Sequence, residues 1–172
     1  MKVLAIGGST SNQSINRQLA NYAADLIDGA DVLHYDFSNY DLPIYSSQRE
    51  AVDGIPQEAI DFAGMIDATD LLVVSLAEHN GSYCAGFKNL IDWTSRITDR
   101  KTWGGKPMLL MATSPGGRGG ATVLAGAEIY FPFMGADLKG TFTLPKFYEN
   151  FKEGKITTAE KNEELIDLIQ SL

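Results

Sequence analysis

The sequence contains a single cysteine, Cys84, among 172 residues. One cysteine cannot form a disulfide within the chain, which agrees with a reducing compartment, so we expect a cytoplasmic location. His34 has no second histidine or cysteine with which to form a metal set, so no metal site is expected. The chain also lacks a cluster of lysine and arginine, and its net charge is −8. Nucleic acid and anionic membrane surfaces are therefore not expected as partners.

Long apolar runs are also missing. The apolar start, residues 1–6, is interrupted by Gly7, Gly8 and Ser9 too early for a secretory signal, and no run reaches the length that spans a bilayer. We therefore expect no membrane segment. Linkers, repeats and low-complexity stretches are absent, and 44% of the residues are hydrophobic. The whole chain, 1–172, is predicted to form one domain with a substantial core.

Apolar runs of strand type alternate with amphipathic stretches of helix type along the chain. Strands are predicted at 2–7, 32–35, 71–76, 108–113 and 137–144, and helices at 14–28, 56–68, 85–97, 120–134 and 158–172. Pro56 suits a first helical turn, and Thr157 with Glu160 is typical of a capping box. The alternation predicts an α/β protein with a parallel sheet covered on both faces. We expect a three-layer α/β/α sandwich whose five strands have the order 2-1-3-4-5.

Ligands of such sheets bind at the carboxyl ends of the strands, so the loops after strands one, three and four are the functional candidates. These loops, at 7–14, 77–84 and 114–120, are rich in glycine, serine and asparagine, and the strand order brings them together. A receiver domain shares the architecture but needs clustered carboxylates after its first strand. Here Gly7, Gly8 and Ser9 occupy that place, so the receiver interpretation is rejected.

The first loop joins a strand to a helix through glycine and hydroxyl residues. Free N–H groups and the positive dipole end of a helix attract an anion there. Ser9, Ser11, Ser14 and Asn16 add neutral donors suited to a phosphate monoester. The pattern matches neither the G-x-G-x-x-G dinucleotide loop nor the G-x-x-x-x-G-K-[ST] nucleotide loop. The same residues also favour helix caps, so a simple capping turn stays open as the alternative.

The three loops together resemble the NADPH-dependent FMN reductase family of flavodoxin-like proteins, over roughly residues 1–140. The first family loop follows the pattern G-S-x-R-x-x-S-x-N. Ser9, Ser14 and Asn16 match it, and Ser11 stands where the family has arginine. Arg17 is close in the sequence but is expected to point elsewhere on the helix.

The second family loop follows the pattern P-E-Y-N-x-S. Glu78, Asn80 and Ser82 match it, whereas Ala77 and His79 replace proline and tyrosine. The next helix matches the family's K-N-x-x-D-W with Lys88, Asn89, Asp92 and Trp93, and the third loop, starting at Ser114, Pro115, Gly116 and Gly117, matches S-P-G-x-x-G-G. Glycines there permit close approach to a planar ligand, although a turn without a ligand would use them too.

The resemblance implies a flavodoxin-like domain that binds FMN, takes hydride from NAD(P)H and passes electrons to a small-molecule acceptor such as a flavin or quinone. It also implies a homodimer or homotetramer, in which residues 42–45 lie near the flavin of the neighbouring subunit. Hydride transfer needs no protein acid, so no side chain is assigned a catalytic role. The expected FMN-binding residues are Ser9, Ser11, Ser14, Ile15 and Asn16 for the phosphate, and Ala77, Glu78, His79, Asn80, Gly81, Ser82, Ser114, Pro115, Gly116 and Gly117 for the ring.

Two other functions stay open from the sequence. An electron carrier would bind FMN and exchange electrons with partners without oxidising NAD(P)H directly. A non-catalytic flavodoxin-like binding domain would have lost the flavin, which the replaced arginine and the altered P-E-Y would fit.

Overall fold

A five-stranded parallel sheet forms the centre of the computed structural model, which describes residues 1–38 and 41–172. The strands are β1 (Lys2–Gly8), β2 (Asp31–Tyr35), β3 (Leu71–Leu76), β6 (Pro107–Thr113) and β7 (Asp137–Leu144). Their order in the sheet is β2-β1-β3-β6-β7, and each neighbouring pair is parallel. Since these are the five predicted strands in the predicted order, the α/β class and the topology are confirmed.

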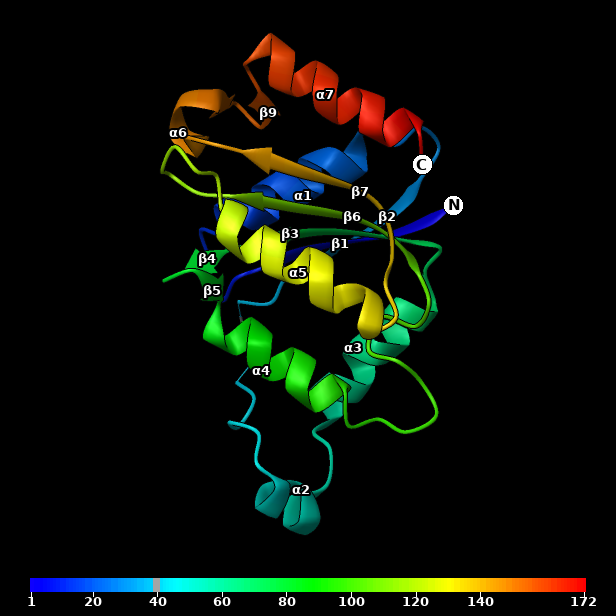
Figure 1. Ribbon diagram of the computed structural model, residues 1–172. Coiled ribbons are helices and arrows are strands. Elements are labelled where there is room, and N and C mark those ends of the chain that lie inside the picture. Colours follow the sequence, from blue (N-terminus) through cyan, green and yellow to red (C-terminus); the bar gives the residue numbers. More distant parts are fainter. Residues whose placement is uncertain (39–40) are drawn as a thin grey trace.

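Helices cover both faces of the sheet (Figure 1). One face carries α1 (Ile15–Asp25) and α7 (Ala159–Gln170), and the other carries α3 (Gln57–Asp67), α4 (Ala85–Thr94) and α5 (Ala121–Phe133). Strands β1 and β3 are almost entirely buried because both of their faces are covered. Each face has its own core, one around Phe62, Phe87 and Trp103 and the other around Leu19 and Leu165.

Several predicted helix ends differ from the structure. Helix α1 stops at Asp25 rather than 28, since the N–H of Ile27 bonds back to Ala24 in a tighter turn. Pro56 is the N-cap of α3 and not part of its first turn. The predicted capping box of Thr157 and Glu160 is wrong. The N-cap of α7 is Thr158, whose hydroxyl donates to Asn150 Oδ1 at 2.5 Å instead of capping the helix.

Short elements between the main ones were not predicted. They are α2 (Ser47–Asp53), α6 (Phe147–Asn150), and the pairs β4 (Glu78–His79) with β5 (Ser82–Tyr83) and β8 (Phe151–Lys152) with β9 (Lys155–Ile156). In the β4–β5 hairpin, Asn80 and Gly81 have φ values of 54° and 80°. These values fit a type I′ turn, for which Asn-Gly is the favoured sequence. The second predicted loop is therefore a small hairpin.

The carboxyl ends of the parallel strands lie together at the edge where β4, β5 and α6 are found (Figure 1). All three loops chosen from the sequence start at this edge. Within the described part of the chain, no helix is both long enough and apolar enough to cross a lipid bilayer.

Candidate functional site

A cavity of about 200 Å³ lies between the three predicted loops. It is lined by ten of the fifteen predicted site residues: Ser9, Ser11, Ser14, Ile15 and Asn16 from the first loop, Ala77, Glu78 and His79 from the second, and Ser114 and Pro115 from the third. Segments about 100 residues apart in the sequence thus meet around one space.

Three further residues line the cavity, although the sequence patterns did not single them out as site residues. Gln13 and Thr113 directly adjoin predicted residues. Tyr148 is on α6, and its side chain is 65% exposed while its neighbour Phe147 is buried. Nothing in the local sequence distinguishes the aromatic residue that lines the cavity from the one that packs in the core.

The other five predicted residues do not line the cavity. Asn80, Gly81 and Ser82 form the exposed tip and return strand of the hairpin. Gly116 and Gly117 are exposed in the third loop. A Cβ atom added at Gly117 would meet no atom within 4 Å, and one at Gly116 would meet only Ser114 Oγ, at 3.8 Å. The third loop therefore presents bare backbone to open space beside the cavity.

Serine hydroxyls give the first loop its internal structure. Ser9 Oγ accepts the N–H of Ser11 at 3.2 Å, and Ser11 Oγ accepts the N–H of Gln13 at 3.2 Å. Ser14, the N-cap of α1, accepts the N–H of Arg17 at 3.1 Å. In each bond the oxygen is the acceptor, so the hydroxyl hydrogen remains able to donate to an anion in the cavity.

The helix that follows this loop starts with no acidic residue in its first turn. The N–H groups of Ile15 and Asn16 belong to that turn and have no acceptor within the helix. Together with the serine hydroxyls, they make this end of the cavity a set of donors without a formal charge, at the positive end of a helix dipole.

Asn16 uses its side chain inside the protein. The residue is 2% exposed. Its Oδ1 accepts from Ser75 Oγ at 2.7 Å and from the N–H of Thr113 at 3.0 Å, and its Nδ2 donates to the carbonyl of Thr113 at 3.1 Å. The side chain thus ties α1 to β3 and β6, just before the third loop begins. The expected side-chain donor to a phosphate is engaged here, which leaves only the backbone N–H of Asn16, in the first turn of α1, without an acceptor in the helix.

Glu78 also uses its side chain within the protein. Its Oε2 accepts the N–H groups of Thr122 and Val123, both at 3.0 Å. These residues lie in the first turn of α5, directly after the third loop. The carboxylate therefore joins the second loop to the third, and the structure gives no sign of its acting as an acid.

The family model described as NADPH-dependent FMN reductase matches residues 1–168. The chain belongs to this family. It is 34% identical over 122 residues to a 2-hydroxy-1,4-benzoquinone reductase of Burkholderia sp, and 31% identical over 121 residues to a quinone reductase of Escherichia coli (strain K12). Each match covers 70% of this chain and 64% of the relative, so the chain spans less than two thirds of their length.

Among solved structures, the chain is similar to the flavoenzyme NAD(P)H:(acceptor) oxidoreductase FerB from Paracoccus denitrificans. The TM-score is 0.77 with 25% sequence identity, and the match covers 99% of this chain and 93% of FerB. The likeness therefore extends over the whole flavodoxin-like fold, including the last helix.

Ser11 stands at the family's arginine position, and among the residues that the structure describes no lysine or arginine lines the cavity to replace that charge. Arg17 points away, as expected from the sequence. Its guanidinium pairs with Asp36 and donates to the carbonyl of Asn12 at 2.6 Å. Hydrogen bonds from Ser38 are the main cause of a pKa below the usual range at Asp36, and Arg17 contributes less. Arg17 thus supports the loop from outside.

The family residues on α4 hold a segment of the chain. Asn89 Nδ2 donates to the carbonyl of Pro43 at 3.0 Å, and its Oδ1 accepts the N–H of Tyr45 at 2.9 Å. Trp93 Nε1 also donates to Pro43, at 2.7 Å. Segment 42–45, which the family resemblance singled out, is therefore fixed to α4, while its Ile44 side chain stays 71% exposed. Lys88 and Asp92, which belong to the same family pattern, form an ion pair at 2.6 Å.

Cys84 is buried. Its Sγ lies 3.7 Å from Thr10 Oγ1 in the first loop. Burial raises the pKa of the Cys84 thiol, but hydrogen bonds from Thr10, Phe87 and Gly86 outweigh it and leave the pKa below its ordinary value.

Proposed function

We propose that the protein is an FMN-dependent oxidoreductase that takes hydride from NAD(P)H and passes electrons to a small acceptor. The acceptor that we propose first is a quinone. Membership of the NADPH-dependent FMN reductase family supports the cofactor and the hydride donor. The names of the bacterial relatives, which are quinone reductases, support the class of acceptor. In this proposal residues 1–172 form one FMN-binding domain.

The observation that carries the proposal is the donor set of the first loop. A phosphate monoester needs several hydrogen-bond donors in one concave place, and a helix N-terminus supplies them without a lysine or arginine. The hydroxyls of Ser9, Ser11 and Ser14 with the N–H groups of Ile15 and Asn16 meet this requirement. The cavity fits the phosphate end of FMN, and the wider ring belongs outside it.

The ring would be held between the hairpin and the third loop. Both have exposed residues at the cavity or beside it, at 79–82 and 115–117, and the third loop has no side chain at Gly116 and Gly117 to keep a planar group away. When bound, FMN supplies a hydride acceptor that can be reduced by a nicotinamide and reoxidised by a quinone. The protein itself then binds and orients FMN and the two substrates. This role agrees with the hydrogen bonds of the Glu78 and Asn16 side chains, which are made within the protein.

Anaerobic mixing of the FMN-loaded protein with NADPH or NADH tests the proposal. We expect loss of the flavin absorption band, and parallel double-reciprocal plots when a benzoquinone is the second substrate. A flavin that stays oxidised on the turnover timescale with both nucleotides would replace this function with that of an electron carrier. A protein that purifies colourless and takes up no FMN in a titration would be a binding domain without flavin.

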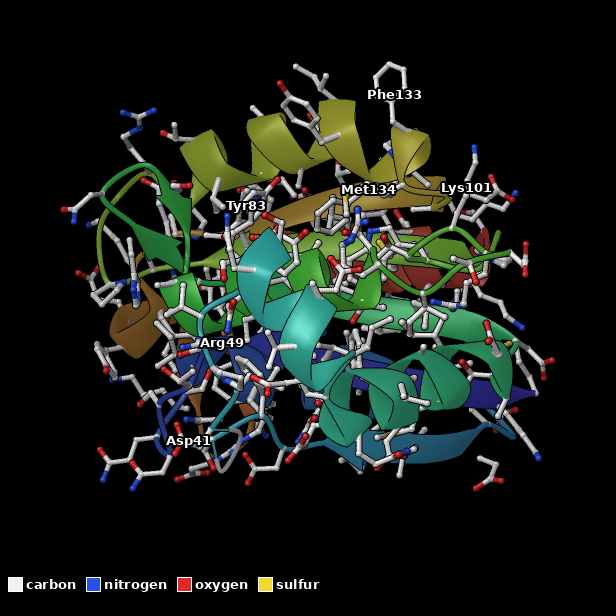
Figure 2. The ribbon with its side chains drawn as sticks, turned by 90° about the horizontal axis from the view of Figure 1, so that it is seen from below. Asp41, Arg49, Tyr83, Lys101, Phe133 and Met134 are labelled. Atoms are coloured by element: carbon white, nitrogen blue, oxygen red, sulfur yellow. The ribbon has the colours of Figure 1, made fainter. Side chains whose placement is uncertain are left out.

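We also propose that the protein is a homo-oligomer of the cytoplasm, a homodimer or homotetramer. Support comes from the outer face of α5, which is apolar although it faces outward. Ile129 and Tyr130 are 62% exposed and Phe133 is 76% exposed, and Figure 2 shows the Phe133 ring pointing away from the rest of the molecule. A groove of about 240 Å³ between α4 and α5, lined in part by Tyr83, Tyr130 and Met134, continues this face toward the hairpin.

The proposed location in the cytoplasm has separate support. The single cysteine is free and buried, which agrees with a reducing compartment.

A further inference from the structure

Helix α5 begins without a capping side chain of its own. Its N-cap residue is Gly120, and its first turn contains no acidic residue. The N–H of Ala121 bonds to the carbonyl of Arg118 at 3.1 Å. The next two N–H groups, of Thr122 and Val123, have no acceptor within the helix and need one from elsewhere.

Glu78 supplies that acceptor from more than 40 residues away in the sequence. One oxygen, Oε2, takes both N–H groups at 3.0 Å. A carboxylate at this place also opposes the positive end of the helix dipole, which strengthens the two hydrogen bonds. The N-terminus of α5 is thus occupied by an anion that belongs to the protein.

The hairpin that carries Glu78 contacts α5 at two more places. A Cβ atom added at Gly81 would lie 3.7 Å from Thr122 Cγ2, so the hairpin turn lies against the first helical turn. Further along, the Tyr83 ring is stacked on Phe131, with centroids 6.0 Å apart and an angle of 13° between the planes. The hairpin therefore follows α5 from its first turn to its third, and Glu78 provides the polar contact.

We propose that Glu78 is a positioning residue that sets the place of the hairpin for the flavin ring through α5, without contacting the flavin with its carboxylate. By filling the N-terminus of α5, the same carboxylate directs the phosphate to α1, whose first turn has no acidic residue. The inference rests on the proposed function for the identity of the ligand. The hydrogen bonds between Glu78 and α5 can be tested in the absence of any ligand.

The experiment compares Glu78→Ala and Glu78→Gln with the unaltered protein. Glutamine keeps an oxygen that can accept both N–H groups, and alanine removes it. Glu128→Ala is the matched control, because Glu128 is an exposed glutamate on the same helix. The first readout is amide hydrogen exchange at Thr122 and Val123 in the flavin-free protein. The second is the Kd of FMN and of riboflavin, from titration of the flavin fluorescence.

In Glu78→Ala we expect exchange at the two amides to be faster by about tenfold or more, which corresponds to the loss of charge-assisted hydrogen bonds. The Kd values of FMN and riboflavin should both rise about tenfold, so that their ratio is unchanged, since the ring and not the phosphate is affected. Glu78→Gln should restore both Kd values to within about threefold of the unaltered protein. Glu128→Ala should change neither readout.

Unchanged Kd values in Glu78→Ala would overturn the positioning role. So would a loss confined to FMN, which would place Glu78 at the phosphate. A Glu78→Gln variant that binds both flavins as weakly as alanine while its two amides stay protected would also overturn it, because the charge would then be required at the flavin. If the unaltered protein bound neither flavin, the proposed function would fail. Amide exchange would then still decide whether Glu78 holds the start of α5.

Discussion

Ser14 performs two tasks at the start of α1 with one hydroxyl group. Its oxygen caps the helix by accepting the N–H of Arg17, and its hydrogen is free to donate to a ligand in the cavity. The capping turn and the phosphate site, which the sequence left as alternatives, are therefore compatible at this residue. The serines at 9 and 11 show the same arrangement within the loop.

Replacing Ser14 with aspartate separates the two tasks. Aspartate is as good an N-cap as serine, so the stability of the protein should hold. Its charge would face the phosphate and remove a donor, so we expect the Kd of FMN to rise tenfold to a hundredfold, about 1–3 kcal/mol, with the Kd of riboflavin unchanged.

Ser46→Asp is the control for this change, because Ser46 caps α2 in the same way, by accepting the N–H of Arg49 at 3.2 Å, and does not line the cavity. It should leave both flavins unaffected. Equal weakening of FMN and riboflavin by Ser14→Asp, as measured by flavin titration, would place the phosphate elsewhere.

At the scale of elements, the sequence predicts what depends on short-range patterns. The five strands and their parallel pairing followed from apolar runs that alternate with helices, and the Asn-Gly turn of the hairpin had a recognisable local sequence. The partners of Asn16 and Glu78 could not be predicted in this way. Thr113 lies 97 residues from Asn16, and Thr122 lies 44 residues from Glu78. The residues next to Asn16 or Glu78 in the sequence therefore carry no information about these hydrogen bonds. Both residues were predicted as site residues, but how their side chains are used depends on tertiary structure.

The Asn16 side chain should be important for stability because it joins three elements in a buried place. Asn16→Leu keeps the size of the side chain but leaves the N–H and the carbonyl of Thr113 without this partner. We expect the free energy of unfolding to fall by about 2–4 kcal/mol, measured by urea denaturation. Gln18→Leu, at an exposed amide of the same helix, should stay within about 0.5 kcal/mol of the unaltered protein. A small effect of Asn16→Leu would mean that α1 is held to the sheet by its apolar face alone.

At the scale of the whole molecule, α5 is apolar on both sides. Val123, Leu124, Ala127 and Phe131 are buried against the sheet, and the opposite side carries exposed aromatic and aliphatic side chains. A helix that is hydrophobic all round is typical of a buried position. A second copy of the chain would bury the outer side. If it also covered the groove between α4 and α5, it would lie next to the hairpin and to segment 42–45, because residues of both line an adjoining cavity.

Phe133→Asp tests this arrangement. A charge at the centre of an apolar interface should weaken self-association by about 2–4 kcal/mol, the range of an interface hot spot, so we expect a dimer or tetramer to become monomer at micromolar concentration. Light scattering after size-exclusion chromatography gives the mass directly. Leu172→Asp is the control, since Leu172 is an exposed apolar residue that follows α7 on the other face of the sheet, and it should leave the mass unchanged. The monomer should keep its fold, because Phe133 is an exposed residue. It should lose FMN affinity only if the partner copy contributes to the site. A monomeric unaltered protein, or a Phe133→Asp variant with unchanged mass, would contradict the proposed interface.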